Sequence, residues 1–346
     1  MKVIIFTMAY NAENTIKRTI ESILNQTFSN FEYYILDNAS TDNTFNVIEK
    51  YSKKDKRIVA LRVNKNDPPN GGAFFRAITY ATNADYIVWC DADDTYSPTF
   101  LEETTKFATD NQLDIVSCGY DKVDGYTGKI IKHRVLDENL ILYGNLFTEE
   151  FVKYRGFTLY LWGKLYSVPF LKSNNLTGTV DKEQICNDSI WTLNIFRVAK
   201  RAGVYGKAMY QYYQYSNSLS NQNIEMNLAS YRQLWLSTKK YLQSYGPISR
   251  LNEDFLYAIN FSIVDEVVNK IFASSKLNIK SKLNLLENVF DDPTWARTLS
   301  RNADPQFRNL AQKHSYVLNV KNRISALPGI EEYENIRSHI FSYLKI

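Results

Sequence analysis

Short apolar runs alternate with segments of helical periodicity along the first half of the chain. Five apolar runs are predicted to be strands: residues 2–7, 31–36, 57–63, 86–90 and 114–118. Apolar side chains recur at helical spacing in residues 12–26 and 43–51, between the strands. Consecutive parallel strands need such a crossover helix. The pattern therefore predicts an α/β fold with a mainly parallel sheet.

Polar residues follow each of the first four predicted strands. They are Tyr10 and Asn11, Asp37 and Asn38, residues 64–72, and the three carboxylates Asp91, Asp93 and Asp94. The carboxyl ends of parallel strands meet at one sheet edge, where loops and helix N-termini bind ligands. We therefore expect these four loops to converge on one site. Asn11 is also predicted to cap the helix at 12–26.

The second half of the chain has a different texture. Turn signals at 124–125 and 127–128 predict an antiparallel hairpin within residues 121–135. Long amphipathic stretches follow residue 221, for example at 226–245 and 256–272. We predict an α/β domain over residues 1–220 and a C-terminal α-helical region over 221–346.

Charge and cysteine content narrow the class of protein. The 41 Lys and Arg residues against 37 Asp and Glu give a net charge of +4, which is too small to indicate a nucleic-acid partner. Cys90, Cys118 and Cys186 lie far apart and disfavour a disulfide framework or a zinc site. There is no signal-peptide pattern and no apolar stretch near the roughly 20 residues of a membrane span. A soluble cytoplasmic protein is expected.

Three carboxylates directly follow the fourth apolar run. Asp91, Asp93 and Asp94 repel one another unless a cation or a helix N-terminus compensates their charge. A hard divalent cation such as Mn²⁺ or Mg²⁺ takes oxygen ligands from one or two carboxylates and from substrate phosphates. The alternative is structural, with Asp94 capping a helix at 99–110. The spacing leaves both interpretations open.

Several segments resemble the family 2 glycosyltransferases of the bacterial polysaccharide type, which have the Rossmann-like GT-A fold. Residues 3–14 resemble that family's first strand and Tyr-Asn motif, and SILNQTF at 22–28 the end of its first helix. LDNASTDNT at 36–44 is similar to its V-D-D-G-S-T-D-x-T turn, and YIVWCDADD at 86–94 to its D-x-D segment. The likeness continues at 161–166, 187–188 and 215–220, in the family's order, and so covers about residues 1–220.

The resemblance implies a site for a nucleoside-diphosphate sugar, with a UDP-sugar expected. Ala9, Tyr10 and Asn38 would lie around the nucleobase. Asn38 stands where many relatives have Asp, and its amide oxygen can still accept the pyrimidine N3–H bond. Arg76 would clamp phosphate oxygens, or it is an exposed helix arginine.

The resemblance also assigns the acidic segment and the divalent cation. Asp91 and Ala92 would contact the nucleotide sugar, and Asp93 would ligate Mn²⁺ or Mg²⁺ beneath the diphosphate. Asp94 is then left as the helix cap. A cation in this place stabilises the charge that develops on the leaving diphosphate.

The acceptor half of the site is implied by later motifs. Asp188 resembles the general base of the family's Glu-Asp pair, although it could instead cap the helix that follows. Trp162 and Lys164 would line the acceptor side, and for Trp162 a place in the core is an equal alternative. Direct attack by the acceptor hydroxyl implies inversion at the anomeric carbon.

The leading hypothesis is an inverting hexosyl- or N-acetylhexosaminyltransferase acting on a glycan or lipid-linked glycan. Asn187 and Gln214 depart from the family's usual Glu and Arg, which leaves a non-catalytic sugar-nucleotide-binding or scaffold subunit as the alternative. A nucleotidyltransferase is disfavoured because residues 7–14 hold no Gly-rich phosphate loop. The C-terminal helices could bind a membrane surface or a second copy of the chain, or present only solvated faces.

Overall fold

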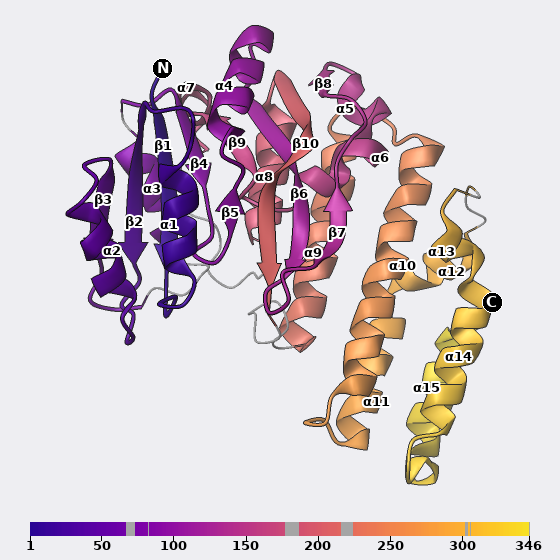
Figure 1. The fold of residues 1–346 in the computed structure, drawn as a ribbon. Coiled ribbons are helices and arrows are strands. Elements are labelled where there is room, and N and C mark those ends of the chain that lie inside the picture. Colours follow the sequence, from indigo (N-terminus) through magenta and orange to yellow (C-terminus); the bar gives the residue numbers. More distant parts are fainter. Residues whose placement is uncertain are drawn as a thin grey trace. The chain divides into compact units, whose positions relative to one another are not determined.

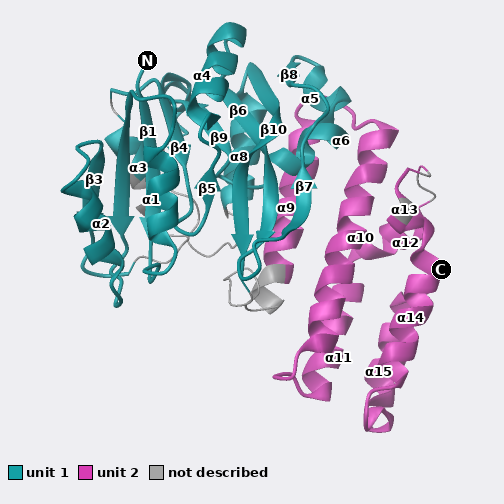
Figure 2. Cartoon of the chain, in the orientation of Figure 1, with its two compact units in different colours: residues 1–221 teal, residues 222–346 magenta. Residues whose placement is uncertain are grey.

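The chain forms two compact units, Met1–Asn221 and Gln222–Ile346, which Figure 2 colours separately. The computed structural model describes residues 1–66, 73–81, 83–176, 187–215, 224–301, 304 and 306–345. Within these ranges the side chains of residues 73–76, 187, 224–227 and 308 are not described.

The first unit is built on a sheet in the order β3-β2-β1-β4-β9-β6-β10-β5, with β7 beside β6 and β8 beside β10. Strands β1 to β4 are mutually parallel, and β9 runs antiparallel to both β4 and β6. The strands are β1 Val3–Ala9, β2 Phe31–Asp37, β3 Ile58–Arg62, β4 Tyr86–Trp89, β5 Thr95–Tyr96, β6 Ile115–Asp124, β7 Ile130–Arg134, β8 Leu140–Tyr143, β9 Lys164–Ser167 and β10 Arg201–Gln214.

The predicted α/β class is confirmed, and all five predicted strands are present as β1, β2, β3, β4 and β6. The predicted hairpin is confirmed as the antiparallel pair β6–β7. Strand β6 is longer than expected, because its second half pairs with both β7 and β10. The pattern did not reveal β5, β8, β9 and β10.

Helices flank the sheet, and their apolar faces form its core with the strand side chains. Helix α1 buries Ile16, Ile20 and Ile23 in the cluster that holds Val3 and Ile5 of β1. Figure 1 shows α1 and α2 in front of the first strands and α3 behind them. The helices of this unit are α1 Ile16–Leu24, α2 Thr44–Ser52, α3 Ala73–Tyr80, α4 Phe100–Asn111, α5 Leu146–Glu149, α6 Phe151–Tyr154, the 3-10 turn η1 Arg155–Phe157, α7 Val168–Ser173 and α8 Asn187–Val198.

The second unit is helical, as its amphipathic stretches predict. Trp295, wholly buried, packs against Phe261 and Phe290, and the Arg301 guanidinium pairs with the buried Asp254. No helix among the described residues is long and apolar enough to cross a membrane. The helices are α9 Ile224–Gln243, α10 Arg250–Ala273, α11 Ile279–Phe290, α12 Pro293–Ser300, α13 Arg308–Ala311, α14 Lys313–Ser325, η3 Ile330–Tyr333 and α15 Glu334–Tyr343.

Candidate active site

The sheet register brings the polar loops of the first unit to one edge. Ala9, the last residue of β1, pairs with Asp37 at the end of β2, and Asp37 pairs with Arg62 at the end of β3. Strand β4 is parallel to β1 and ends one peptide before Cys90, whose N–H donates to the carbonyl of Phe6. The loops after all four strands therefore lie at the same carboxyl edge, where α/β sheets bind ligands.

The predicted nucleobase residues lie at the ends of β1 and β2. Ala9 and Asn38 are buried, and their main chains are joined by an N–H···O bond of 2.8 Å from Asn38 to Ala9. Tyr10 is half exposed, so its ring is accessible to a ligand. The carbonyl of Asn38 also accepts from the Asn66 side chain at 3.1 Å.

Asn11 does not cap the first helix, contrary to the prediction. Helix α1 begins at Ile16, and Asn11 adopts a left-handed backbone with φ of 48°. Its side-chain oxygen accepts from the N–H of Thr41 at 2.9 Å, while its own N–H donates to Ser40 Oγ at 3.0 Å. Asn tolerates this conformation better than most residues. Asn11 thus joins the β1 and β2 loops.

Asp94 is not a helix cap either. Strand β5 follows it directly, and α4 begins only at Phe100, preceded by Thr99. The Asp94 carboxyl group is buried and accepts from Tyr210 Oη and from the main-chain N–H of Tyr213, both at 2.7 Å. Burial, and after it the charges of Asp93 and Asp91, raise the pKa of Asp94 well above its usual range. Asp94 therefore fixes the acidic segment to β10.

The other two carboxylates of the segment are not held in this way. Asp91 and Asp93 receive no side-chain hydrogen bond or ion pair from another described residue. Desolvation by the surrounding protein, followed by the charges of Asp93 and Asp188, raises the pKa of Asp91 to about 7. Desolvation also raises the pKa of Asp93. Asp91 as a whole remains exposed, so water moderates its shift.

This donor set fits a hard divalent cation that is completed by water and phosphate. Such a cation needs only one or two protein carboxylates, and it would relieve the repulsion between Asp91 and Asp93. The described residues contain no cluster of three or more His, Cys, Asp or Glu side chains arranged to hold a metal ion. The described residues therefore do not form a metal site whose ligands all come from the protein.

Arg18 supports the acidic segment, and the sequence pattern did not reveal it. Its guanidinium, on α1, donates to the main-chain carbonyl of Asp93 and to Tyr215 Oη at 3.2 Å. The guanidinium carbon lies 3.5 Å from the ring centroid of Tyr213, a cation–π contact. These partners are 75 and 197 residues away in sequence, so helical spacing alone gave no signal.

Asp188 lies in the first turn of α8. One carboxylate oxygen accepts from the N–H of Ser189 at 2.7 Å. Burial raises its pKa to about 6, while Ser189 and the Lys164 ammonium act in the opposite direction. The charge of Asp188 also contributes to the pKa of Asp91. The charges of Asp188, on α8, and Asp91, after β4, therefore influence one another.

Trp162 and Lys164 lie inside the protein. Trp162 is 6% exposed and stacks between Tyr160 and Tyr210, with ring centroids at 4.3 and 4.4 Å. Lys164, the first residue of β9, is 2% exposed. Contact of either residue with an acceptor stays a prediction. The side chains of Arg76 and Asn187 are outside the described part, and so are residues 67–72 and 216–220.

Residues 4–165 match the family described as glycosyl transferase family 2. These residues make up most of the first unit and form a glycosyl transferase family 2 domain. Two relatives from Bacillus subtilis (strain 168) are the uncharacterized glycosyltransferase EpsJ, 28% identical over 250 residues, and the putative glycosyltransferase EpsH, 23% identical over 307 residues. The first match covers 71% of each chain, and the second covers 86% of each.

Solved glycosyltransferase structures share the fold. Staphylococcus aureus TarS 1–349, in a complex with UDP-GlcNAc, has a TM-score of 0.61 at 21% identity, over 99% of this chain and 91% of that one. The mannosyltransferase PcManGT from Pyrobaculum calidifontis, in a complex with GDP-Man and Mn²⁺, has a TM-score of 0.53 at 13% identity, over 99% and 85% of the two chains. The predicted GT-A fold is confirmed.

In this glycosyltransferase, Arg18→Met is expected to lower kcat/KM about 10- to 100-fold. The change removes a charge-assisted hydrogen bond to the main chain of Asp93, which is worth about 1.5–3 kcal/mol. Steady-state kinetics with a nucleotide-sugar donor at several Mn²⁺ concentrations would measure the loss. Lys17→Met, on an exposed side of the same helix, is the matched control. Wild-type kinetics in Arg18→Met would contradict the supporting role.

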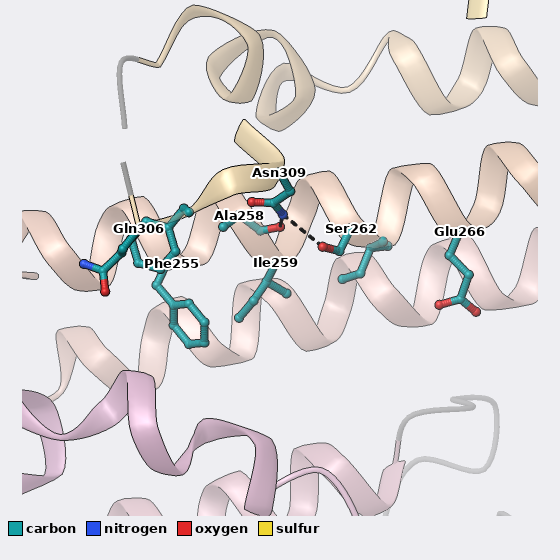
Figure 3. Close-up of a pocket in the computed structure, with 9 residues that line it drawn as sticks. Phe255, Ala258, Ile259, Ser262, Glu266, Gln306 and Asn309 are labelled. Atoms are coloured by element: carbon teal, nitrogen blue, oxygen red, sulfur yellow. Dashed lines mark hydrogen bonds between the residues drawn. The ribbon is translucent and has the colours of Figure 1, made fainter. Parts of the chain in front are cut away.

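The glycosyltransferase also has a cavity of about 360 Å³ within its second unit. Figure 3 shows its lining by α10 side chains, among them Phe255 and Ile259, and by Asn309, whose amide donates to Ser262 Oγ at 3.0 Å. None of the predicted site residues lines it.

Proposed function

We propose that the protein is an inverting glycosyltransferase that moves a sugar from a nucleoside-diphosphate donor to a hydroxyl of a glycan or lipid-linked glycan. The observation that carries the proposal is the presence of two sets of carboxylates in the first unit. Asp91 and Asp93 receive no side-chain hydrogen bond or ion pair from another described residue, and the charge of Asp188, on α8, acts on Asp91. Asp91 and Asp93 suit a cation bound to the diphosphate, and Asp188 suits removal of a proton from the acceptor.

The donor would occupy the carboxyl edge of β1, β2 and β4. Ala9, Tyr10 and Asn38 would surround the base, Asp91 and Ala92 would contact the ribose and diphosphate, and Arg76 would clamp phosphate. UDP is the nucleotide we propose, because the structural neighbour TarS is known with UDP and with UDP-GlcNAc. A hexosyl or N-acetylhexosaminyl group would be transferred. The reaction would take place in the cytoplasm.

Mn²⁺ or Mg²⁺ would be held by Asp93, with Asp91 close by. The PcManGT neighbour with GDP-Man and Mn²⁺ supports this expectation. When bound, the cation supplies a Lewis acid for the charge of the leaving diphosphate. The chain itself would contribute the position of the acidic segment. Asp94 bonds this segment to β10, and Arg18 bonds it to α1.

Asp188 would accept the proton of the acceptor hydroxyl. The hydroxyl oxygen then forms a bond to the anomeric carbon as the bond to the diphosphate breaks, and the electron pair leaves with the nucleoside diphosphate. Attack from the opposite face gives inversion. With a pKa of about 6, Asp188 is mostly ionised at neutral pH and can act as a base.

The second candidate is a non-catalytic sugar-nucleotide-binding or scaffold subunit. Asn187 and Gln214, in place of an acid and an arginine, are the observations in its favour. Asp93 and Asp188 are both kept, however, and that combination favours catalysis. The helical second unit would serve membrane attachment or self-association in either case.

Thermal shift with UDP and GDP, each with and without Mn²⁺, tests donor binding. Ligands that bind only the folded state raise Tm according to concentration and affinity. We expect UDP with Mn²⁺ to raise Tm, and chelation of Mn²⁺ with EDTA to reverse the rise. If no nucleoside diphosphate changes Tm with the metal present, a nucleotide-sugar site is contradicted for both candidates.

A further inference from the structure

The segment 159–163, between η1 and β9, has its main chain held by side chains at every residue. The carbonyl of Leu159 accepts from Ser189 Oγ, that of Leu161 from Tyr166 Oη at 3.0 Å, and the N–H of Gly163 donates to Tyr96 Oη at 2.8 Å. The carbonyls of the two remaining residues, Tyr160 and Trp162, both accept from Lys164 Nζ. A loop held in this way has little freedom to move.

Lys164 has no simple structural explanation. Its side chain is 2% exposed, and its ammonium forms no ion pair with a carboxylate of the described residues. A buried ammonium without an ion partner is costly, and an apolar residue would fill the same space at a lower cost. Two carbonyl contacts, one of them at 3.4 Å, compensate only part of that cost.

The segment connects the two halves of the proposed site. Toward α8, Leu159 and Tyr160 accept from the hydroxyls of Ser189 and Thr192, on the helix that carries Asp188. Toward β4, the Tyr96 hydroxyl that binds Gly163 donates to the carbonyl of Trp89 at 2.8 Å, two residues before Asp91. Lys164 is thus placed where the base and the acidic segment are joined.

We propose that Lys164 is a positioning residue for the transfer reaction, whose ammonium holds segment 159–163 and provides the positive charge that faces Asp188. This inference rests on the proposed function. This role differs from the direct contact with the acceptor that the sequence predicts for Lys164, because the buried ammonium acts through Asp188. The ammonium favours the ionised form of the base, the form that can remove a proton.

The electrostatics around the pair agree with this geometry. Burial lowers the pKa of Lys164 to about 7, and the groups facing it, Cys118 of β6 and Asp188, raise it. The groups facing Asp188 are Lys164, the Asp91 carboxylate, and the hydroxyls of Tyr160 and Tyr166. Lys164 is the cation of this set. Without it, the pKa of Asp188 would rise.

The test is the pH profile of kcat/KM in full-length Lys164→Gln and Lys164→Met. Both remove the charge, and Lys164→Gln keeps an N–H donor, although its nitrogen is one bond closer to the main chain. In the wild type, activity should be lost as the pH falls through about 6, where Asp188 takes up a proton. We call this loss of activity at low pH the acid limb of the profile. In both variants we expect the acid limb to lie about one pH unit higher, with the donor Kd unchanged.

Tyr96→Phe is the control for a purely structural role. It removes the bonds to the N–H of Gly163, in the same segment, and to the carbonyl of Trp89, and it leaves the ammonium in place. This variant should lower kcat without moving the acid limb. If Lys164→Met does not fold, Lys164→Gln decides.

An acid limb that stays in place in folded Lys164→Gln overturns the inference and leaves the proposed function intact. A shift of the limb by Tyr96→Phe as large as that in Lys164→Gln also overturns it, because loosening of the segment would then explain both. A wild-type protein that binds donor but shows no turnover overturns the proposed function and this inference together.

Discussion

Asp188→Asn should lower kcat for sugar transfer about 10²- to 10⁴-fold, the usual contribution of a general base. The amide cannot take up the proton of the acceptor hydroxyl, yet its oxygen can still accept the 2.7 Å bond from the N–H of Ser189. Local structure should therefore survive. Initial rates at saturating donor and acceptor, together with the donor Kd from calorimetry, would separate catalysis from binding.

The stability of Asp188→Asn gives an independent check. The folded-state pKa of Asp188 is raised to about 6, so ionisation above that pH disfavours the folded state. A neutral amide removes this penalty, and at pH 7.5 the variant should be at least as stable as the wild type. Asp110→Asn, on the exposed part of α4, is the matched control and should change neither kcat nor the stability of the protein. Retained turnover in Asp188→Asn would remove this residue as the base.

Asp93→Ala should lower kcat/KM at least about 100-fold at moderate Mn²⁺ concentrations. Its carboxylate receives no side-chain hydrogen bond or ion pair from another described residue, so removal should cost little stability while it weakens cation binding. Kinetics over a Mn²⁺ titration should show a metal requirement displaced to much higher concentration. The measurement thus distinguishes a lost ligand from a damaged fold.

Asp94→Asn serves as the contrasting variant in the same segment. Asp94 is hydrogen-bonded to Tyr210 and Tyr213. Its replacement should therefore lower Tm more than it changes the apparent Mn²⁺ affinity. Full activity of Asp93→Ala at the wild-type Mn²⁺ optimum would show that the metal role is wrong.

The carboxyl edge of the sheet was predictable from sequence because local signals suffice there. Each of β1 to β4 is a short apolar run followed by polar residues, and the rule that parallel strands share an edge brings those residues together. Asp91 and Asp93 could be singled out because three carboxylates after a buried strand need compensation. The family motifs then separated the roles that spacing left open.

Residues whose partners lie far away in sequence could not be predicted. Arg18 looks like any arginine on α1 until Asp93 and Tyr215 are placed beside it. The cap assigned to Asp94 was wrong because β10, which was not predicted, supplies its partners. Asn11 was misassigned for a similar reason, since Thr41 of the neighbouring loop takes up its side chain. Tertiary contacts override local capping rules in both cases.

Release of nucleoside diphosphate by the purified chain tests the central claim most directly. UDP- and GDP-linked sugars would be supplied with Mn²⁺ and a mixture of glycan acceptors, with EDTA, Asp93→Ala and Asp188→Asn as parallel reactions. We predict release from at least one donor, strongly reduced in all three parallel reactions. A donor that binds but is never cleaved, whatever the acceptor and metal, would contradict catalysis and favour the scaffold.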